Sequence, residues 1–411
     1  MATAAQPVTF KAILQHKPFR TLWLAQFVSV FGDFLALFGV INLITFRMHG
    51  TAVQVTAVTI AFALPLAIVG PLSGVFVDRW NVKRLMIASD LIRAVLILAL
   101  VLARDVREIS VIFILLSAVS SFFAPAQTVT LRTLVPPEGL LAANALTSQT
   151  FYVVRILAPS LAGLLISVLG ENACFYLDSL SFLFSAAMLS TLVIVRPGTK
   201  TAGKTLKAFT GDFLAGNKFI FTHSGLSFVF VAMAVAMFIL SSFSPLISIY
   251  IRDFLHAGPI LFGVISSMVG IGLILGTQVV NRVARSRAAT SVVLSGLLGL
   301  GIGVAVLGIF RNVPMASAST FTMGFAIALV LVPAQTMSQR ETPHHMIGRV
   351  SSSFMSLISL AQVLGLLLSG VMAQIVGIRT LFLASAALLA IVAGLGRLWV
   401  RDKNPAVAAG A

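Results

Sequence analysis

The sequence has 411 residues, of which 58% are hydrophobic and only 10% are charged, with a mean hydropathy of +1.04. Soluble domains carry about a quarter charged residues, so this composition excludes a water-soluble globular protein. The net charge is +16, but the basic residues lie between long apolar runs, which argues against a nucleic-acid-binding protein. The single cysteine, Cys174, excludes an internal disulfide and a thiolate metal site.

Twelve stretches are long and apolar enough to cross a membrane, since a spanning helix needs about 20 mostly apolar residues. In chain order we expect these helices at residues 20–46, 52–77, 85–103, 109–131, 141–169, 173–195, 226–251, 259–281, 288–310, 313–336, 350–376 and 379–400. The one long polar gap, residues 196–223, is rich in lysine and is expected to form a basic linker at the membrane surface. The pattern predicts an all-α polytopic membrane protein.

The distribution of basic residues predicts the orientation of the chain. Placing the N-terminus, every even-numbered loop and the C-terminus on one side puts 20 of the 28 Lys and Arg residues there and 6 on the other. Cytoplasmic loops carry an excess of Lys and Arg. We therefore expect both termini in the cytoplasm of a bacterium, with the protein in its cytoplasmic (inner) membrane.

The two halves of the sequence repeat one another. Pro125-Ala126-Gln127-Thr128 recurs as Pro333-Ala334-Gln335-Thr336, an offset of 208. After one gap the offset becomes 207, and it then pairs Pro136 with Pro343, Gly163 with Gly370 and Gly170 with Gly377. An offset of six helices gives both copies the same topology, as in transporters built from two six-helix halves. We expect two pseudo-symmetric halves of six helices each, at residues 1–195 and 224–411.

A charged motif stands between the second and third predicted helices. It reads Gly74-Val-Phe-Val-Asp78-Arg79-Trp-Asn-Val-Lys83-Arg84, and it resembles the cytoplasmic loop motif of the major facilitator superfamily, G-x-x-x-D-R-x-G-R-R/K. Asn81 replaces the usual loop glycine, and Asn tolerates the left-handed conformation of a tight turn.

The resemblance implies the major facilitator fold and a gating role for this loop. In the family, the motif aspartate pairs with helices of the opposite half and stabilises the outward-facing state. We therefore expect Gly74, Asp78 and Arg79 to act in gating. The ordinary excess of positive charge in cytoplasmic loops is sufficient to explain Lys83 and Arg84.

The fifth predicted helix carries a second family-like motif. Ala158-Pro159-Ser160-Leu161-Ala162-Gly163 resembles the G-P-x-x-G-G motif of antiporter members, with two glycines replaced by alanine. Small residues let helices approach closely, and Pro159 removes a backbone donor and bends the helix.

Four further stretches are similar to the bacterial macrolide-efflux and siderophore-exporter branch of the superfamily. They are residues 16–20, 26–33, 89–93 and 122–126. The Gly32-Asp33 and Pro125-Ala126 elements also resemble lysophospholipid transporters of the same superfamily.

Five charged residues lie more than one turn from either end of a predicted helix, where charge is costly and indicates function: Asp33, Asp90, Arg93, Arg155 and Asp178. Asp33 lies roughly 20 Å from the cytoplasmic end of its helix at 1.5 Å per residue, near the middle of the membrane. Arg155 lies at about the same depth. We expect Asp33 to bind the proton or a cationic substrate, with Arg155 as its counter-charge; the alternative is a static buried ion pair.

The other three charges are expected to have lesser roles. Asp90 and Arg93 are three residues apart, so they can meet on one helix face, as a structural or gating pair near the loop motif. Asp178 lies about 8 Å from the outer end of its helix by the same rise, where we expect it to be hydrated or paired locally.

Helices one, four, seven and ten line the central cavity in this superfamily. The residues that the resemblance places there are Gln26, Phe31, Phe34, Asn42, Phe122, Phe123, Gln127, Phe238, Phe243 and Gln335. An aromatic, weakly polar cavity with one acid suits a bulky amphipathic substrate.

Two other patterns carry no function of their own. Residues 198–205 match the phosphate-binding pattern G-x-x-x-x-G-K-[ST], but that motif works only between a buried strand and a helix, for which the linker has no room. His344 and His345 are expected to be a solvated loop pair and not a metal site. No catalytic or cofactor motif is present, so we expect neither an enzyme nor a bound cofactor or metal.

The sequence thus predicts a secondary active transporter that exports bulky, amphipathic, drug-like or macrolide-like compounds in exchange for protons. Its expected partners are a small-molecule or lipid-like substrate, protons and membrane lipids, without nucleic acid, and we expect a monomer. The alternatives are a lysophospholipid or siderophore transporter of the same fold, and a passive facilitator in which Asp33 and Arg155 are structural.

Overall fold

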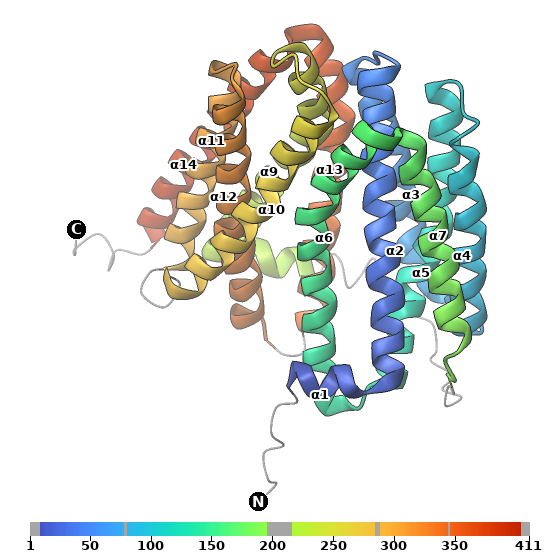
Figure 1. Cartoon of the computed structure of the whole chain (residues 1–411). Helices are drawn as coiled ribbons and strands as arrows, with labels where there is room; N and C mark the ends of the chain where they lie inside the picture. Colours follow the sequence, from blue (N-terminus) through green and yellow to red (C-terminus); the bar gives the residue numbers. More distant parts are fainter. Residues whose placement is uncertain (1–8, 78–79, 195–215, 284–287, 344–345, 404–411) are drawn as a thin grey trace, which may run out of the picture. The chain divides into compact units, whose positions relative to one another are not determined.

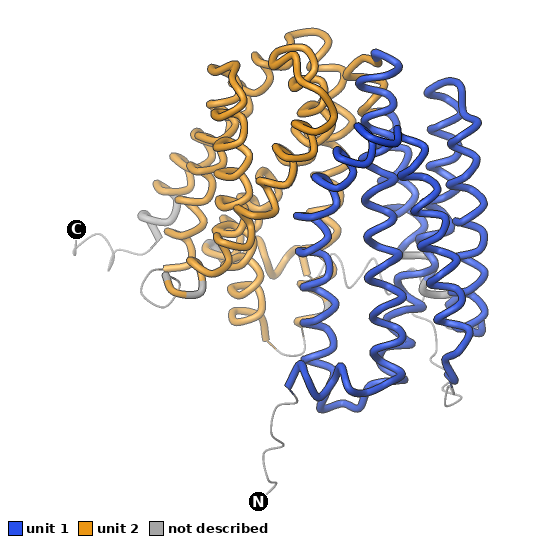
Figure 2. Tube along the Cα trace, viewed as in Figure 1, with its two compact units in different colours: residues 1–49, 57–203 blue, residues 50–56, 204–411 orange. Residues whose placement is uncertain are grey.

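The computed structural model describes residues 9–77, 80–194, 216–283, 288–343 and 346–403, and within these ranges it is helical without strands (Figure 1). The chain divides into two compact units (Figure 2): unit 1 is residues 1–49 and 57–203, and unit 2 is residues 50–56 and 204–411. Figures 1 and 2 show each unit as a bundle of long helices.

Each of the twelve predicted spans corresponds to one long helix. Those of unit 1 are α2 (Lys17–Asn42, continued by the π-helical turn Leu43–Arg47), α3 (Ala52–Val77), α4 (Val82–Ala99), α5 (Val106–Leu134), α6 (Leu140–Leu169) and α7 (Glu171–Ser190). Those of unit 2 are α9 (Ser224–Asp253), α10 (Pro259–Val283), α11 (Ala289–Ile309), α12 (Val313–Glu341), α13 (Ile347–Val376) and α14 (Ile378–Lys403). The first turn of α3 belongs to unit 2.

Two shorter α-helical segments among the described residues were not predicted. The helix α1 (Phe10–Gln15) precedes α2, and Thr9 caps it by accepting a hydrogen bond from the amide of Ala12. Residues 216–222 are helical although they fall inside the predicted linker. Residues 196–215 of that linker, which include residues 198–205, lie outside the described residues, as do His344 and His345.

Eleven of the described helices are apolar enough along their length to cross a membrane. The exception among the twelve is α4, which is 18 residues long and carries four charges: Lys83, Arg84, Asp90 and Arg93. Charge is tolerated inside a membrane where it faces the bundle and is paired. The charges of α4, the least apolar helix of unit 1, are therefore candidates for a functional site.

The internal repeat reappears in the helix ends. Asp105 and Asn312, 207 residues apart, are the N-caps of α5 and α12, and their side chains accept hydrogen bonds from the amides of Glu108 (2.8 Å) and Met315 (2.9 Å). Gly170 and Gly377 both adopt positive φ, +80° and +83°, where they end one helix and precede the next. Only a residue without a Cβ reaches that conformation easily.

Close helix packing in unit 2 depends on glycine, because small residues let backbones approach in a membrane. A Cβ on Gly324 of α12 would overlap the carbonyl of Val269 on α10 and lie 2.7 Å from its carbonyl carbon. A Cβ added to Gly394 of α14, by contrast, would have no neighbouring atom within 4 Å.

We therefore expect Gly324→Ala to destabilise the protein, since overpacking a tight contact costs about 1–3 kcal/mol. The measurement is the thermal unfolding midpoint in detergent. Gly394→Ala is the matched control and should leave the midpoint unchanged or raise it slightly, because Ala is the better helix former. Equal midpoints for the two variants would contradict the packing argument.

Candidate functional site

Three helices of unit 1 bring four intramembrane charges together. Asp33 comes from α2, Asp90 and Arg93 from α4, and Asp178 from α7. Arg93 donates to Asp90 Oδ1, and its Nη1 lies 3.7 Å from Asp33 Oδ2. Asp90 Oδ2 also accepts a hydrogen bond from Ser185 of α7 (2.7 Å). We call Asp33, Asp90, Arg93 and Asp178 the acidic cluster, since it contains three carboxyl groups and one guanidinium.

Aromatic rings hold the guanidinium of Arg93 in position. Its central carbon lies 4.7 Å from the centre of the Phe123 ring and 4.2 Å from that of Phe182. Cations are attracted to the faces of aromatic rings, and the rings cannot compete for its hydrogen bonds. The side chain of Arg93 is 4% exposed, so its charge is available only to the carboxyl groups of the cluster.

Gly32 allows α7 to approach α2 at the cluster. A Cβ at this position would overlap Asp178 Oδ1 and Ser181 Oγ, and would lie 2.9 Å from Ser181 Cβ. The same turn of α2 therefore supplies Gly32, whose missing side chain leaves room for α7, and the acid Asp33. Asp178 is 1% exposed and its Oδ1 accepts a hydrogen bond from Ser181 (3.2 Å).

The structure corrects one expectation about these charges and decides another. The ion pair of Asp33 is with Arg93, whereas Arg155, its expected counter-charge, is exposed on α6. Of the two environments expected for Asp178, hydration or local pairing, the structure shows the second: Asp178 is buried and accepts a hydrogen bond from Ser181 of its own helix. It also lies beside Gly32 of α2, which the sequence did not predict. Depth counted along one helix does not reveal which face a residue occupies or how neighbouring helices are staggered.

Asp90 and Arg93 meet on one face of α4, as predicted from their spacing, but they also join Asp33. Asp178 is the residue whose place in this group the sequence reasoning missed. The signal for it was present, since it is an unpaired acid in a spanning helix.

The predicted cavity residues of unit 1 lie in different environments. Gln26 and Asn42 are buried, and Gln26 Nε2 and Asn42 Oδ1 have no hydrogen-bond partner among the described residues. Phe123 packs on Arg93, while its neighbour Phe122 stacks on Trp80 with ring centres 6.0 Å apart. The remaining three are half-buried: Phe31, Phe34 and Gln127. Gln26 and Asp33 are seven residues apart, so they share one face of α2.

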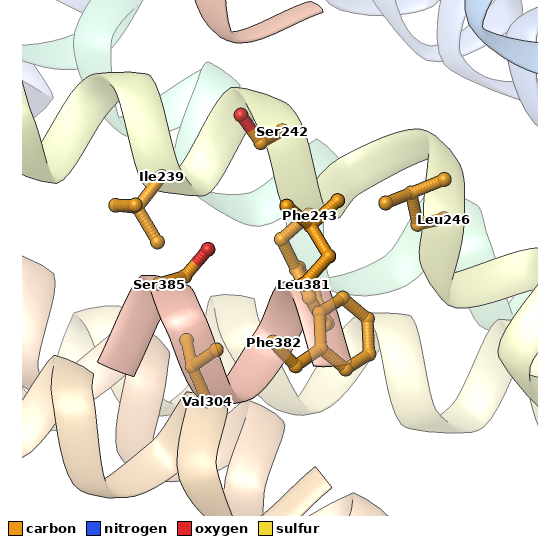
Figure 3. Close-up of a pocket in the computed structure, with 8 residues that line it drawn as sticks. All are labelled: Ile239, Ser242, Phe243, Leu246, Val304, Leu381, Phe382 and Ser385. Atoms are coloured by element: carbon orange, nitrogen blue, oxygen red, sulfur yellow. The ribbon is translucent and has the colours of Figure 1, made fainter. Parts of the chain in front are cut away.

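In unit 2, Phe238 is half-buried and Gln335 is exposed. Phe243 lines a small pocket between α9, α11 and α14 (Figure 3), together with Ile239, Ser242, Leu246, Val304, Leu381, Phe382 and Ser385. The hydroxyl of Ser242 is already bonded to the carbonyls of Phe238 (2.9 Å) and Gly365 (3.0 Å). The pocket is therefore mainly apolar, and no titratable group lines it.

Both family-like motifs occupy helix ends or interfaces. Gly74 lies in α3, whereas Asp78 and Arg79 are outside the described residues. Asn81 adopts an extended conformation (φ −71°) instead of a left-handed one, and it caps α4 by accepting from the amide of Arg84 (3.1 Å).

Lys83 donates to the carbonyl of Ser190 at the end of α7 (2.6 Å), where a cation is favoured by the helix dipole. Arg84 is exposed. In α6, Ala158, Pro159 and Gly163 are all buried.

Comparison with known proteins assigns the family. The sequence model of the family described as "Transmembrane secretion effector" matches residues 8–407. The chain is a member of the major facilitator superfamily.

Among curated members, it is 29% identical to the MFS-type transporter YfiS of Bacillus subtilis (strain 168), over 92% of each chain. It is 24% identical to macrolide efflux protein A of Streptococcus pyogenes (91% of this chain, 94% of the relative). It is 25% identical to the multidrug efflux pump Tap of Mycolicibacterium fortuitum (82% and 84%).

Solved structures of the major facilitator superfamily share the fold at low sequence identity. The nucleoside transporter NupG aligns with a TM-score of 0.77 at 12% identity, over 93% of this chain and 99% of that chain. A bacterial homologue of the human lysosomal transporter Spinster aligns with a TM-score of 0.71 at 15% identity, over 97% and 98%. This chain is therefore a multi-pass transporter of the superfamily, for which its relatives imply small-molecule substrates.

Proposed function

We propose that this protein exports bulky, amphipathic, drug-like or macrolide-like compounds in exchange for protons. In this proposal it works as a monomer in the bacterial inner membrane, with both termini in the cytoplasm. Residues 1–195 and 224–411 act as its two six-helix halves, and residues 196–223 link them. Relatives named as macrolide and multidrug efflux proteins support the substrate class.

The acidic cluster is the observation that carries the proposal. Three carboxyl groups surround one guanidinium, so the cluster has an excess of acids over bases. A buried carboxylate without a counter-charge is costly and takes up a proton instead. Such a cluster therefore has a reason to bind protons, which a static one-to-one ion pair lacks.

Asp33 is the member of the cluster through which we expect substrate and proton to be coupled. Its side chain is 26% exposed, whereas those of Asp90 and Arg93 are 0% and 4% exposed. An amphipathic cation that reached Asp33 would compete with the proton for the same carboxylate. Gln26, on the same face of α2, would offer its unpartnered amide to a polar group of the substrate.

The test is transport by the purified protein in liposomes that contain a pH-sensitive dye. With a proton gradient imposed, erythromycin should trigger proton movement in the wild type. In Asp33→Asn, which removes the charge and keeps the shape, we expect proton movement no greater than in empty liposomes.

Asp253→Asn is the matched control, since Asp253 is exposed and paired with its neighbour Arg252 in unit 2. This variant should transport like the wild type. Coupled transport by Asp33→Asn would contradict the role of Asp33. Erythromycin flux without proton movement in the wild type would instead indicate a passive facilitator.

A further inference from the structure

Asp178 differs from the other two acids of the cluster in having no counter-charge of its own. Asp90 receives the closest contact of Arg93 and a hydrogen bond from Ser185, and Asp33 lies 3.7 Å from the same guanidinium. Among the described residues, Asp178 forms no ion pair, and its buried Oδ2 has no hydrogen-bond partner. Within the part of the chain that the structure describes, Ser181 of the same helix is the one donor that bonds to its side chain.

The charged and titratable groups around Asp178 are few. Asp33 faces it from α2, Asp90 and Arg93 face it from α4, and the thiol of Cys174 lies one turn away on α7. The acidic cluster has one guanidinium for three carboxyl groups, and Arg93 pairs with Asp90 and Asp33. Even with Asp90 and Arg93 neutralising one another, two acids remain in a region that water does not reach at Asp178.

Burial decides which form Asp178 takes. An isolated carboxylate in an apolar interior costs far more than its protonated form, and two adjacent carboxyl groups cannot both ionise cheaply. The protonated acid, by contrast, carries no charge and needs no counter-charge. Asp33 follows Gly32, the residue of α2 beside which Asp178 lies.

We propose that Asp178 is a second proton-binding group of the transport cycle, which binds a proton of its own and exchanges it through Asp33, the neighbour of Gly32 on the helix packed against α7. The proton binds to the Asp178 carboxylate, giving the neutral acid. It leaves through Asp33, the exposed member of the cluster. This inference rests on the proposed function for its role in transport, but proton binding by Asp178 can be tested without a substrate.

The first experiment is infrared difference spectroscopy of the purified protein between acidic and alkaline pH. A protonated carboxyl group has a carbonyl band distinct from the bands of a carboxylate. We expect a band in the wild type that titrates, that is missing in Asp178→Asn, and that shifts in frequency in Ser181→Ala. The Ser181 variant keeps the acid and removes the hydroxyl that bonds to Asp178 Oδ1 (3.2 Å) and to the backbone carbonyl of Asp178 (2.7 Å), so the shift assigns the band.

The second experiment counts protons moved per erythromycin transported, at a pH where the amine of erythromycin is fully protonated. Asp178→Asn should move one proton fewer than the wild type, and Ser181→Ala should keep the wild-type count. An Asp178 band that does not titrate, or an unchanged proton count in Asp178→Asn, would overturn the proposal. If the wild type moves no protons with erythromycin, the proposed function fails, whereas the infrared titration still decides whether Asp178 binds an exchangeable proton.

Discussion

Replacing Arg93 with methionine is expected to abolish coupled transport and to lower the free energy of unfolding by about 3–5 kcal/mol, the usual effect of removing one partner of a buried ion pair. Methionine keeps most of the apolar contact with Phe123 and Phe182, since its thioether packs well against aromatic rings. The loss therefore reports the charge, which Asp90 and Asp33 share. Thermal unfolding in detergent and the liposome assay measure the two effects.

A double variant separates folding from transport. Adding Asp90→Asn to Arg93→Met removes the carboxylate that Arg93 contacts most closely, so much of the stability should return. Transport should not return, because Asp33 still lacks its guanidinium. Arg93→Lys should recover only part of either property, since an ammonium group lacks the planar fork that Arg offers to two acids and two rings. A stable Arg93→Met protein with wild-type transport would show that the ion pairs of Arg93 are dispensable.

Gly32→Ala is expected to disrupt the acidic cluster by adding a single methyl group. The new Cβ would overlap the side chains of Asp178 and Ser181 and lie 2.9 Å from Ser181 Cβ, which forces α2 and α7 apart. Overpacking of this kind costs about 1–3 kcal/mol. Coupled transport should fall much further than stability, because the displaced groups are those that we propose to bind the proton.

Gly39→Ala is the control for packing alone. Gly39 lies two turns along the same face of α2, and its added Cβ would lie 3.0 Å from Cys174 Cβ and 3.2 Å from the Phe175 ring. This variant should lose less stability than Gly32→Ala, since its contacts are tight without overlapping, and it should keep the number of protons moved per substrate. If both glycine variants lost stability and transport in the same proportion, the special role of Gly32 would be refuted.

The sequence alone was sufficient for the architecture of this protein. The length and apolarity of each run predicted the twelve long helices. No water is available in a membrane to pair with backbone groups, and a helix pairs all of them within one segment. The family followed from short motifs such as residues 74–84. The spacing of Asp90 and Arg93 also predicted their pairing, since residues three apart meet on a helix.

Only the tertiary structure decided which charges meet. Asp33, Arg93 and Asp178 come from three helices, and they lie near one another because of how those helices are rotated and staggered. Counting residues along one helix gives neither the rotation nor the stagger. The same limitation led to Arg155 being expected beside Asp33, and it left open whether Asp178 is hydrated or paired locally. Helix existence depends on local composition, whereas the acidic cluster depends on long-range packing through Gly32, which brings α7 against α2.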